Sequence, residues 1–142
     1  MKVRPLIRKL RISLYKICTV YYLVHMYRFG NHIRSLRESL SQESKEYSVR
    51  KVAKKIGVEP AFLSKVEREV VPPPSEAKII ALAEVLGDDK DVLLAMAGKV
   101  SSDLLKIITD RPALFAELIR KLKKEPDHAV LRIVREVKDG EW

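Results

Sequence analysis

The sequence has few of the residues that build disulfide-bonded, sheet-rich or metal-binding proteins. Its 142 residues include one cysteine (Cys18), five glycines and 6% aromatic residues. A single cysteine excludes an intramolecular disulfide and a cysteine-based zinc site, and it is typical of a reducing compartment. So few glycines and aromatic residues disfavour a sheet with many tight turns. We therefore expect an all-α protein in the cytoplasm.

The patterns that mark enzymes are also missing. The three histidines are scattered along the chain and have no metal-ligand spacing. No glycine-rich phosphate loop and no pair of spaced carboxylates is visible, and no motif places a base beside Ser64. We predict a protein that is not an enzyme and that has no cofactor and no metal site.

Positive charge is the main bulk feature that the sequence does have. The formal net charge is +9, which favours a polyanionic partner. Residues 1–37 hold nine Lys and Arg and no acid, whereas residues 38–142 are neutral in total. The bulk charge thus says little about residues 48–68, but their six bases and two acids give that stretch a local charge of +4.

Residues 1–28 form a basic and apolar extension that differs from the rest of the chain. The apolar run Ile17–Val24 is much shorter than the ~20 residues that a membrane helix needs. No cleavage site of small residues follows it, which disfavours a secretory signal. An amphipathic helix at a membrane surface is one interpretation. The other is that the native protein begins at Met26, so that residues 1–25 do not belong to it.

The stretch from Ser48 to Arg68 predicts two helices joined by a tight turn. Ser48 suits the N-cap of the first helix, Gly57 suits the left-handed residue that ends it, and Pro60 suits the first turn of the second. Small and basic residues share the outward face of this second helix, 59–68, at helical spacing: Ala61, Ser64, Lys65 and Arg68.

Apolar periodicity adds three helices around this pair and completes a unit of five helices over residues 29–98. The first begins at Phe29 and is followed by a polar loop, residues 41–47. The others follow the proline-rich residues 70–74 and end at Gly87 and Gly98.

Two charged residues border the apolar faces of this unit. Arg37 lies one helical turn after Ile33, and Glu67 lies one turn after Leu63. A partly buried carboxylate needs a cation, so we predict an ion pair between Arg37 and Glu67 that links the first helix to the third.

The order of these residues resembles a known family. Ser48, Ala53, Gly57 and Val58, followed by Leu-Ser-Lys-Val-Glu-Arg at 63–68, are similar to the phage-repressor and Cro-like (XRE-type) helix-turn-helix family. The resemblance covers about residues 29–98. It implies a five-helix DNA-binding domain of a prokaryotic transcriptional regulator, commonly dimeric, with the Arg37–Glu67 ion pair. The sequence departs from the family in a longer loop after the first helix and in Glu69, where a glycine is usual.

The resemblance also implies roles by position. The positions that read bases are Pro60, Ala61, Ser64 and Lys65, and those that bind phosphate at the start of the first helix of the pair are Ser48 and Val49. The outward basic residues Arg50, Lys51 and Arg68 are predicted to contact phosphate as well. Because Pro60 and Ala61 offer no hydrogen bonds, direct readout would depend mainly on Ser64 and Lys65.

Residues 99–142 predict three further helices with more apolar surface than they can bury among themselves. Such an excess indicates contact with another chain or with the preceding unit, and dimerisation is the simplest case. We therefore predict a sequence-specific regulator, a dimeric repressor that binds double-stranded DNA. Two alternatives stay open: an antitoxin whose C-terminal helices bind a toxin, and a membrane-surface interaction module that uses residues 1–28.

Overall fold

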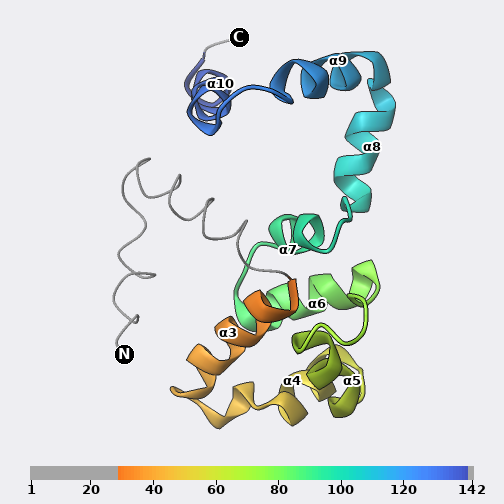
Figure 1. Cartoon of the computed structure of the whole chain (residues 1–142), viewed down its shortest axis with the longest axis vertical. Helices are drawn as coiled ribbons and strands as arrows, with labels where there is room; N and C mark the ends of the chain where they lie inside the picture. The colour runs from red at the N-terminus through yellow and green to blue at the C-terminus, as the bar shows by residue number, and fades with distance from the viewer. Residues whose placement is uncertain (1–28, 141–142) are drawn as a thin grey trace.

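The computed structural model describes residues 29–140, and within this range it contains eight α-helices, one 3-10 helix and no strand (Figure 1). The predicted all-α class is confirmed. The predictions for residues 1–28 lie outside the described residues. The elements are α3 (Phe29–Ser41), η1 (Lys45–Tyr47), α4 (Val49–Ile56), α5 (Pro60–Glu67), α6 (Glu76–Leu86), α7 (Lys90–Met96), α8 (Ser102–Asp110), α9 (Pro112–Leu122) and α10 (Asp127–Asp139).

Helices α3 to α7, here called the body, pack around one hydrophobic core. Each of the five helices contributes at least one side chain that is 0–1% exposed, namely Ile33, Val52, Leu63, Ile79 and Leu93. Helix α6 packs against both α4 and α7, while α5 packs against α3 and α4. The apolar periodicity of the sequence thus gives the buried face of α3 to α6, whereas in α7 Leu93 and Leu94 are buried and Val92 is 39% exposed.

The turn between α4 and α5 follows the local chemistry of its residues. Gly57 has a φ of 68°, and the backbone N–H of Val58 donates to the carbonyl of Ala53 at 2.9 Å. Lys78 of α6 donates to the carbonyls of Ile56 and Gly57 at 2.8 and 3.0 Å. A side chain of a neighbouring helix thus supplies hydrogen bonds to backbone carbonyls at the end of α4. Backbone carbonyls at a helix end need such partners. The turn is therefore fixed from both sides.

The backbone leaves α5 through a second left-handed residue. Glu69 has a φ of 59°, a value that no other non-glycine residue among 29–140 reaches on the positive side. A side chain in this region costs about 1–2 kcal/mol because its Cβ crowds the following carbonyl. This backbone conformation is a physical reason for the glycine that the family usually has here.

The segment predicted as a loop, residues 41–47, contains the short helix η1. The Ser44 hydroxyl caps it by accepting from the backbone N–H of Glu46 at 3.2 Å. Side-chain caps of this kind stabilise local turns that apolar periodicity does not reveal. Tyr47, at the end of η1, is half-buried against the core. The loop is thus ordered beside the start of α4.

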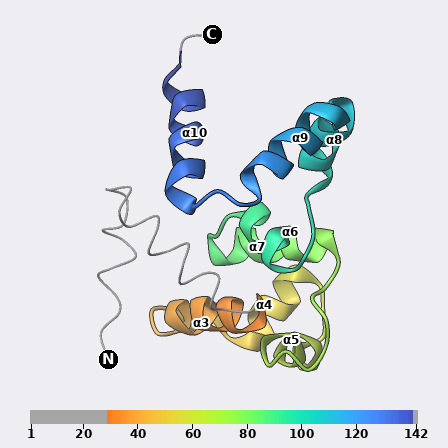
Figure 2. The ribbon, with the colours of Figure 1, turned by 45° about the horizontal axis from the view of Figure 1, so that its top comes forward.

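Helices α8 to α10, here called the arm, extend away from the body (Figures 1 and 2). None of their residues is buried, and the main packing within the arm is between α8 and α9. No helix among residues 29–140 has the length and apolar character needed to cross a membrane. The large apolar side chains that remain 38–62% exposed are Leu104, Leu105, Ile107, Leu114, Leu118, Ile119, Ile133, Val134 and Val137.

Polar contacts hold the first turn of the arm against the body. Glu76 accepts from the backbone N–H and the hydroxyl of Ser102 at 2.8 and 2.9 Å. Lys90 donates to Asp103 at 2.9 Å, and this hydrogen bond is the largest of the contacts that lower the pKa of Asp103 to about 2. The preceding residue, Ser101, is 1% exposed. The start of α8 therefore has a defined position relative to α6 and α7.

Gly30 of α3 allows a close approach to the end of α5. A Cβ added at Gly30 would overlap the carbonyl oxygen of Val66 and lie 3.1 Å from that of Glu67. Relieving this overlap requires a backbone shift, so Gly30→Ala should lower the free energy of unfolding by about 1–3 kcal/mol. This expected loss is the net change, after the gain of about 1 kcal/mol in helix propensity has been subtracted. Chemical denaturation measures the difference.

Ser35→Ala is the control for Gly30→Ala because Ser35 is exposed on the same helix. It should change stability by no more than about 0.5 kcal/mol. If Gly30→Ala proved as stable as Ser35→Ala, the close approach of α3 to α5 would be wrong.

Candidate nucleic-acid interface

Helix α5 lies at the end of the body that is opposite to the arm (Figures 1 and 2). Its inward residues Leu63, Val66 and Glu67 are 1–4% exposed. On the other side, Ala61 and Lys65 are exposed and Ser64 is half-buried. The stripe predicted from helical spacing thus faces outward, away from the core.

The four residues predicted to read bases share this part of α5. Pro60 is its first residue, and Ala61, Ser64 and Lys65 follow along the outward face. The Lys65 ammonium group has no ion pair or hydrogen bond within residues 29–140. An unpaired ammonium group on a presented helix can donate to an acceptor in a ligand.

The residues predicted to bind phosphate lie on both sides of the α4–α5 turn. Ser48 is the N-cap of α4, but its side chain makes no capping hydrogen bond, so the hydroxyl stays available. A helix N-terminus carries unpaired N–H groups and a partial positive charge, which favour an anion beside Val49. Arg50 is exposed and unpaired within the described chain. Arg68 ends α5 and donates one guanidinium hydrogen bond, at 3.2 Å, to the Ser64 carbonyl.

Lys51 differs from Arg50 because it already has an acidic partner. Its ammonium group pairs with Glu46 of η1, and Lys55 approaches the other oxygen of the same carboxylate at 3.5 Å. Lys55 also lies 5.5 Å from the centre of the Tyr47 ring. The hydrogen bond from Lys51, together with the charges of both lysines, lowers the pKa of Glu46. The carboxylate is therefore ionised beside the predicted phosphate-binding residues.

Glu46 was not among the site residues predicted from the sequence, because no local pattern marks it. It lies five residues before Lys51, and no acidic residue follows it before Glu59. The ordered turn η1 is needed to bring the two side chains together, and η1 was predicted as a loop.

Arg37 and Glu67 lie in direct contact in the core between α3 and α5. The Arg37 Nε donates to one carboxylate oxygen of Glu67 at 2.5 Å, and Nη2 donates to the other at 2.9 Å. The remaining guanidinium nitrogen donates to the Tyr47 carbonyl at 3.3 Å. The two residues are 7% and 4% exposed. This bidentate pair joins α3, α5 and η1, and it fixes which face of α5 points outward.

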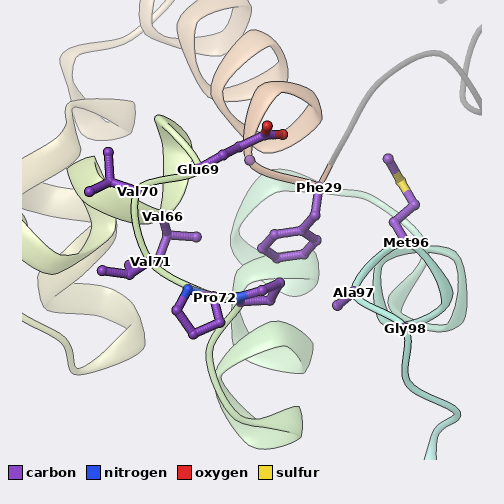
Figure 3. A pocket seen from close by; sticks show the side chains of 11 residues that line it. Phe29, Val66, Glu69, Val70, Val71, Pro72, Met96, Ala97 and Gly98 are labelled. Atoms are coloured by element: carbon purple, nitrogen blue, oxygen red, sulfur yellow. The ribbon is translucent and has the colours of Figure 1, made fainter.

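A pocket of about 510 Å³ lies where the chain leaves α5 (Figure 3). Phe29, Val66, Pro72 and Met96 give it a largely apolar lining, and Glu69 lies at its edge. None of the predicted DNA-contacting residues lines it. Among residues 29–140, no group of three or more His, Cys, Asp or Glu side chains could hold a metal ion. The pocket and the outward face of α5 are thus separate features.

Comparison with known families agrees with this geometry. Residues 33–88 match the family model described as helix-turn-helix, the HTH_3 family. The match covers fewer than half of the 142 residues, but it includes α4, α5, and both Arg37 and Glu67. No curated protein and no solved structure matches the chain. Residues 33–88 are therefore similar to the XRE-type helix-turn-helix family of DNA-binding regulators.

The energetic role of the buried ion pair can be measured by neutralising one partner. Glu67→Gln leaves the Arg37 guanidinium without a counter-charge in the core, and such a change costs about 3–5 kcal/mol. We expect a loss of unfolding free energy of that size in chemical denaturation.

Glu43→Gln is the matched control, because Glu43 is exposed and has no ion pair among residues 29–140. It should cost less than about 1 kcal/mol. Equal denaturation midpoints for Glu67→Gln and the unsubstituted protein would show that the pair adds nothing to stability.

Proposed function

We propose that the chain is a sequence-specific transcriptional regulator, a dimeric repressor that reads the DNA major groove with helix α5. The supporting observation is the outward face of α5, where Lys65 is unpaired and exposed on a helix held by the Arg37–Glu67 pair. The major groove is about 12 Å wide and accepts one α-helix. In proteins with a helix-turn-helix, the first residues of the second helix reach the base edges.

The residues of α5 suit a readout with few hydrogen bonds. Pro60 and Ala61 carry no polar side-chain atoms, so they would contact thymine methyl groups or the sugar edges. Ser64 and Lys65 would donate to base acceptors such as the O6 and N7 atoms of guanine. Part of the sequence preference would then come from the shape of the DNA.

Phosphate groups would be held around the start of α4 and the end of α5. Ser48 and Val49 offer a hydroxyl and the helix N-terminus, and Arg50, Lys51 and Arg68 offer positive charge. These contacts would fix the position of α5 on the duplex without reading sequence.

We further propose that residues 29–98 form the DNA-binding domain, and that residues 99–142 hold two copies together through the arm. The exposed fractions of the nine apolar side chains named above sum to roughly four to five whole side chains per copy. Burying each side chain contributes about 1.5–3 kcal/mol, and two copies supply such surface twice. The gain is large enough to offset the about 4–15 kcal/mol that association costs.

The charge of the arm is compatible with a second copy as its occupant. Residues 102–140 carry nine Lys and Arg and seven Asp and Glu, so two arms would repel each other only weakly. Self-association would also give two α5 helices, which could meet half-sites about 34 Å apart on a symmetric operator.

The antitoxin is the second candidate, since the same apolar arm would accept a small protein partner in place of a second copy. A stoichiometric partner that purifies with the chain from its native cell would favour it. The membrane-surface interpretation concerns residues 1–28, which the structure does not describe. A cytoplasmic location also stays a prediction.

Substitutions at Lys65 and Arg50 separate base reading from phosphate binding. Lys65→Ala should weaken binding to the selected operator by about 1–3 kcal/mol and change binding to random DNA much less. Arg50→Ala should weaken binding to both and lower the dependence of log K on log salt by about 0.9. Fluorescence anisotropy with the operator selected from native genomic fragments measures both effects.

Lys106→Ala is the control for charge alone, because Lys106 is exposed on α8 in the arm. It should bind both duplexes as the unsubstituted protein does. Equal losses of Lys65→Ala on operator and random DNA would contradict base reading, and binding to all duplexes without any preferred site would contradict sequence-specific regulation.

A charge on the apolar face of α10 tests the dimer. Val134 is 56% exposed, so Val134→Glu should leave the isolated chain folded but place a carboxylate in the proposed interface. We expect sedimentation to show a dimer for the unsubstituted protein and a monomer for Val134→Glu. His128→Glu is the matched control, since His128 is exposed on the opposite face of α10 and should leave the dimer intact. A dimer that survives Val134→Glu would place the interface elsewhere.

A further inference from the structure

We infer that Glu46 weakens binding to DNA of any sequence, because its carboxylate engages Lys51 and Lys55 on the side of α4 where phosphate would lie. This inference rests on the proposed DNA-binding function. It assigns Glu46 a role in setting how strongly the protein holds random DNA.

The geometry gives one carboxylate to two lysines. Lys51 and Lys55 lie one helical turn apart on α4, so their ammonium groups can reach the same point. One carboxylate oxygen of Glu46 pairs with the ammonium group of Lys51, and the other lies 3.5 Å from the ammonium group of Lys55. The Ser44 cap holds η1 in the turn that presents Glu46.

The exposed cations near the α4–α5 turn therefore fall into two sets. Those exposed and without an ion pair in the described part of the chain are Arg50, Lys54, Lys65 and Arg68. Lys51 and Lys55 share the charge of Glu46. The side chains of the first set can contact phosphate or bases directly. Lys51 and Lys55 must first break their contact with the Glu46 carboxylate, or share it with the phosphate.

The position of Glu46 also brings it close to bound DNA. It lies two residues before Ser48, the residue at the N-terminus of α4 where a phosphate is expected. Its carboxylate lies along the flank of α4, beside Lys51 and Lys55, and would repel a phosphate that approached either lysine. The side chains of Glu46 and Lys51 are both about half exposed, so their ion pair is a weak surface contact that phosphate can displace.

Weak binding to random DNA has a use for a regulator. Electrostatic contacts with phosphate supply nearly all of the non-specific affinity, and a genome offers a large excess of non-specific sites. Reducing these contacts on α4 leaves the side chains of α5 unchanged. Glu46 would thus limit retention on random DNA by acting on a different helix from the one that reads bases.

The test compares Glu46→Gln with Glu43→Gln in the full chain. Both substitutions remove one negative charge from the same segment, but Glu43 is exposed and has no ion pair among residues 29–140. On a short random duplex at low salt, Glu46→Gln should bind about three- to tenfold more tightly and depend more steeply on salt, by about 0.9 in slope. Glu43→Gln should change the affinity less than about twofold, because exposed charges without a close partner are screened.

A second comparison attributes the effect to the lysines. In the background Lys51→Ala with Lys55→Ala, adding Glu46→Gln should produce no larger change than Glu43→Gln does. A Glu46→Gln protein that binds random DNA no better than Glu43→Gln, or more weakly, overturns the inference. An unsubstituted protein with no salt-dependent DNA binding overturns the proposed function and this inference together.

Discussion

The contact on which the rest of the body depends is the buried pair of Arg37 and Glu67. Both charges are removed from water, and only complete hydrogen bonding offsets that desolvation. Two guanidinium donors meet the two oxygens of Glu67, and a third meets the Tyr47 carbonyl. Because this geometry involves α3, α5 and η1 at once, α5 cannot rotate without breaking it. The face of α5 that points outward is therefore set by a contact on its inner side.

Local chemistry made much of this body predictable from the sequence. Gly57 and Pro60 mark the end of α4 and the start of α5 through backbone preferences that need no knowledge of neighbours. Helical spacing was enough to place Arg37 and Glu67 beside apolar faces. Base reading and phosphate binding by the residues of α4 and α5 stay predictions, because position on an exposed face does not measure contact with DNA.

What the sequence did not reveal depends on tertiary placement. Gly30 matters because α3 meets the carbonyl of Val66, 36 residues away in the chain. Lys78 caps α4 only after α6 has packed beside it. Glu46 meets Lys51 only because residues 45–47 form a turn. In each case the residue type is ordinary and the partner is distant or held by an unpredicted element, so no local pattern marks it.

The body and the arm differ in how far their apolar side chains are buried. Every helix of the body buries apolar side chains within the chain, whereas the arm buries none of its large apolar side chains. The two parts meet at a polar junction, where Glu76 and Lys90 hold Ser102 and Asp103. If two arms pair as proposed, this junction transmits their geometry to the body and so limits the separation of the two α5 helices. Affinity for a symmetric operator would then depend on contacts far from the DNA, while α5 alone would determine which bases are read.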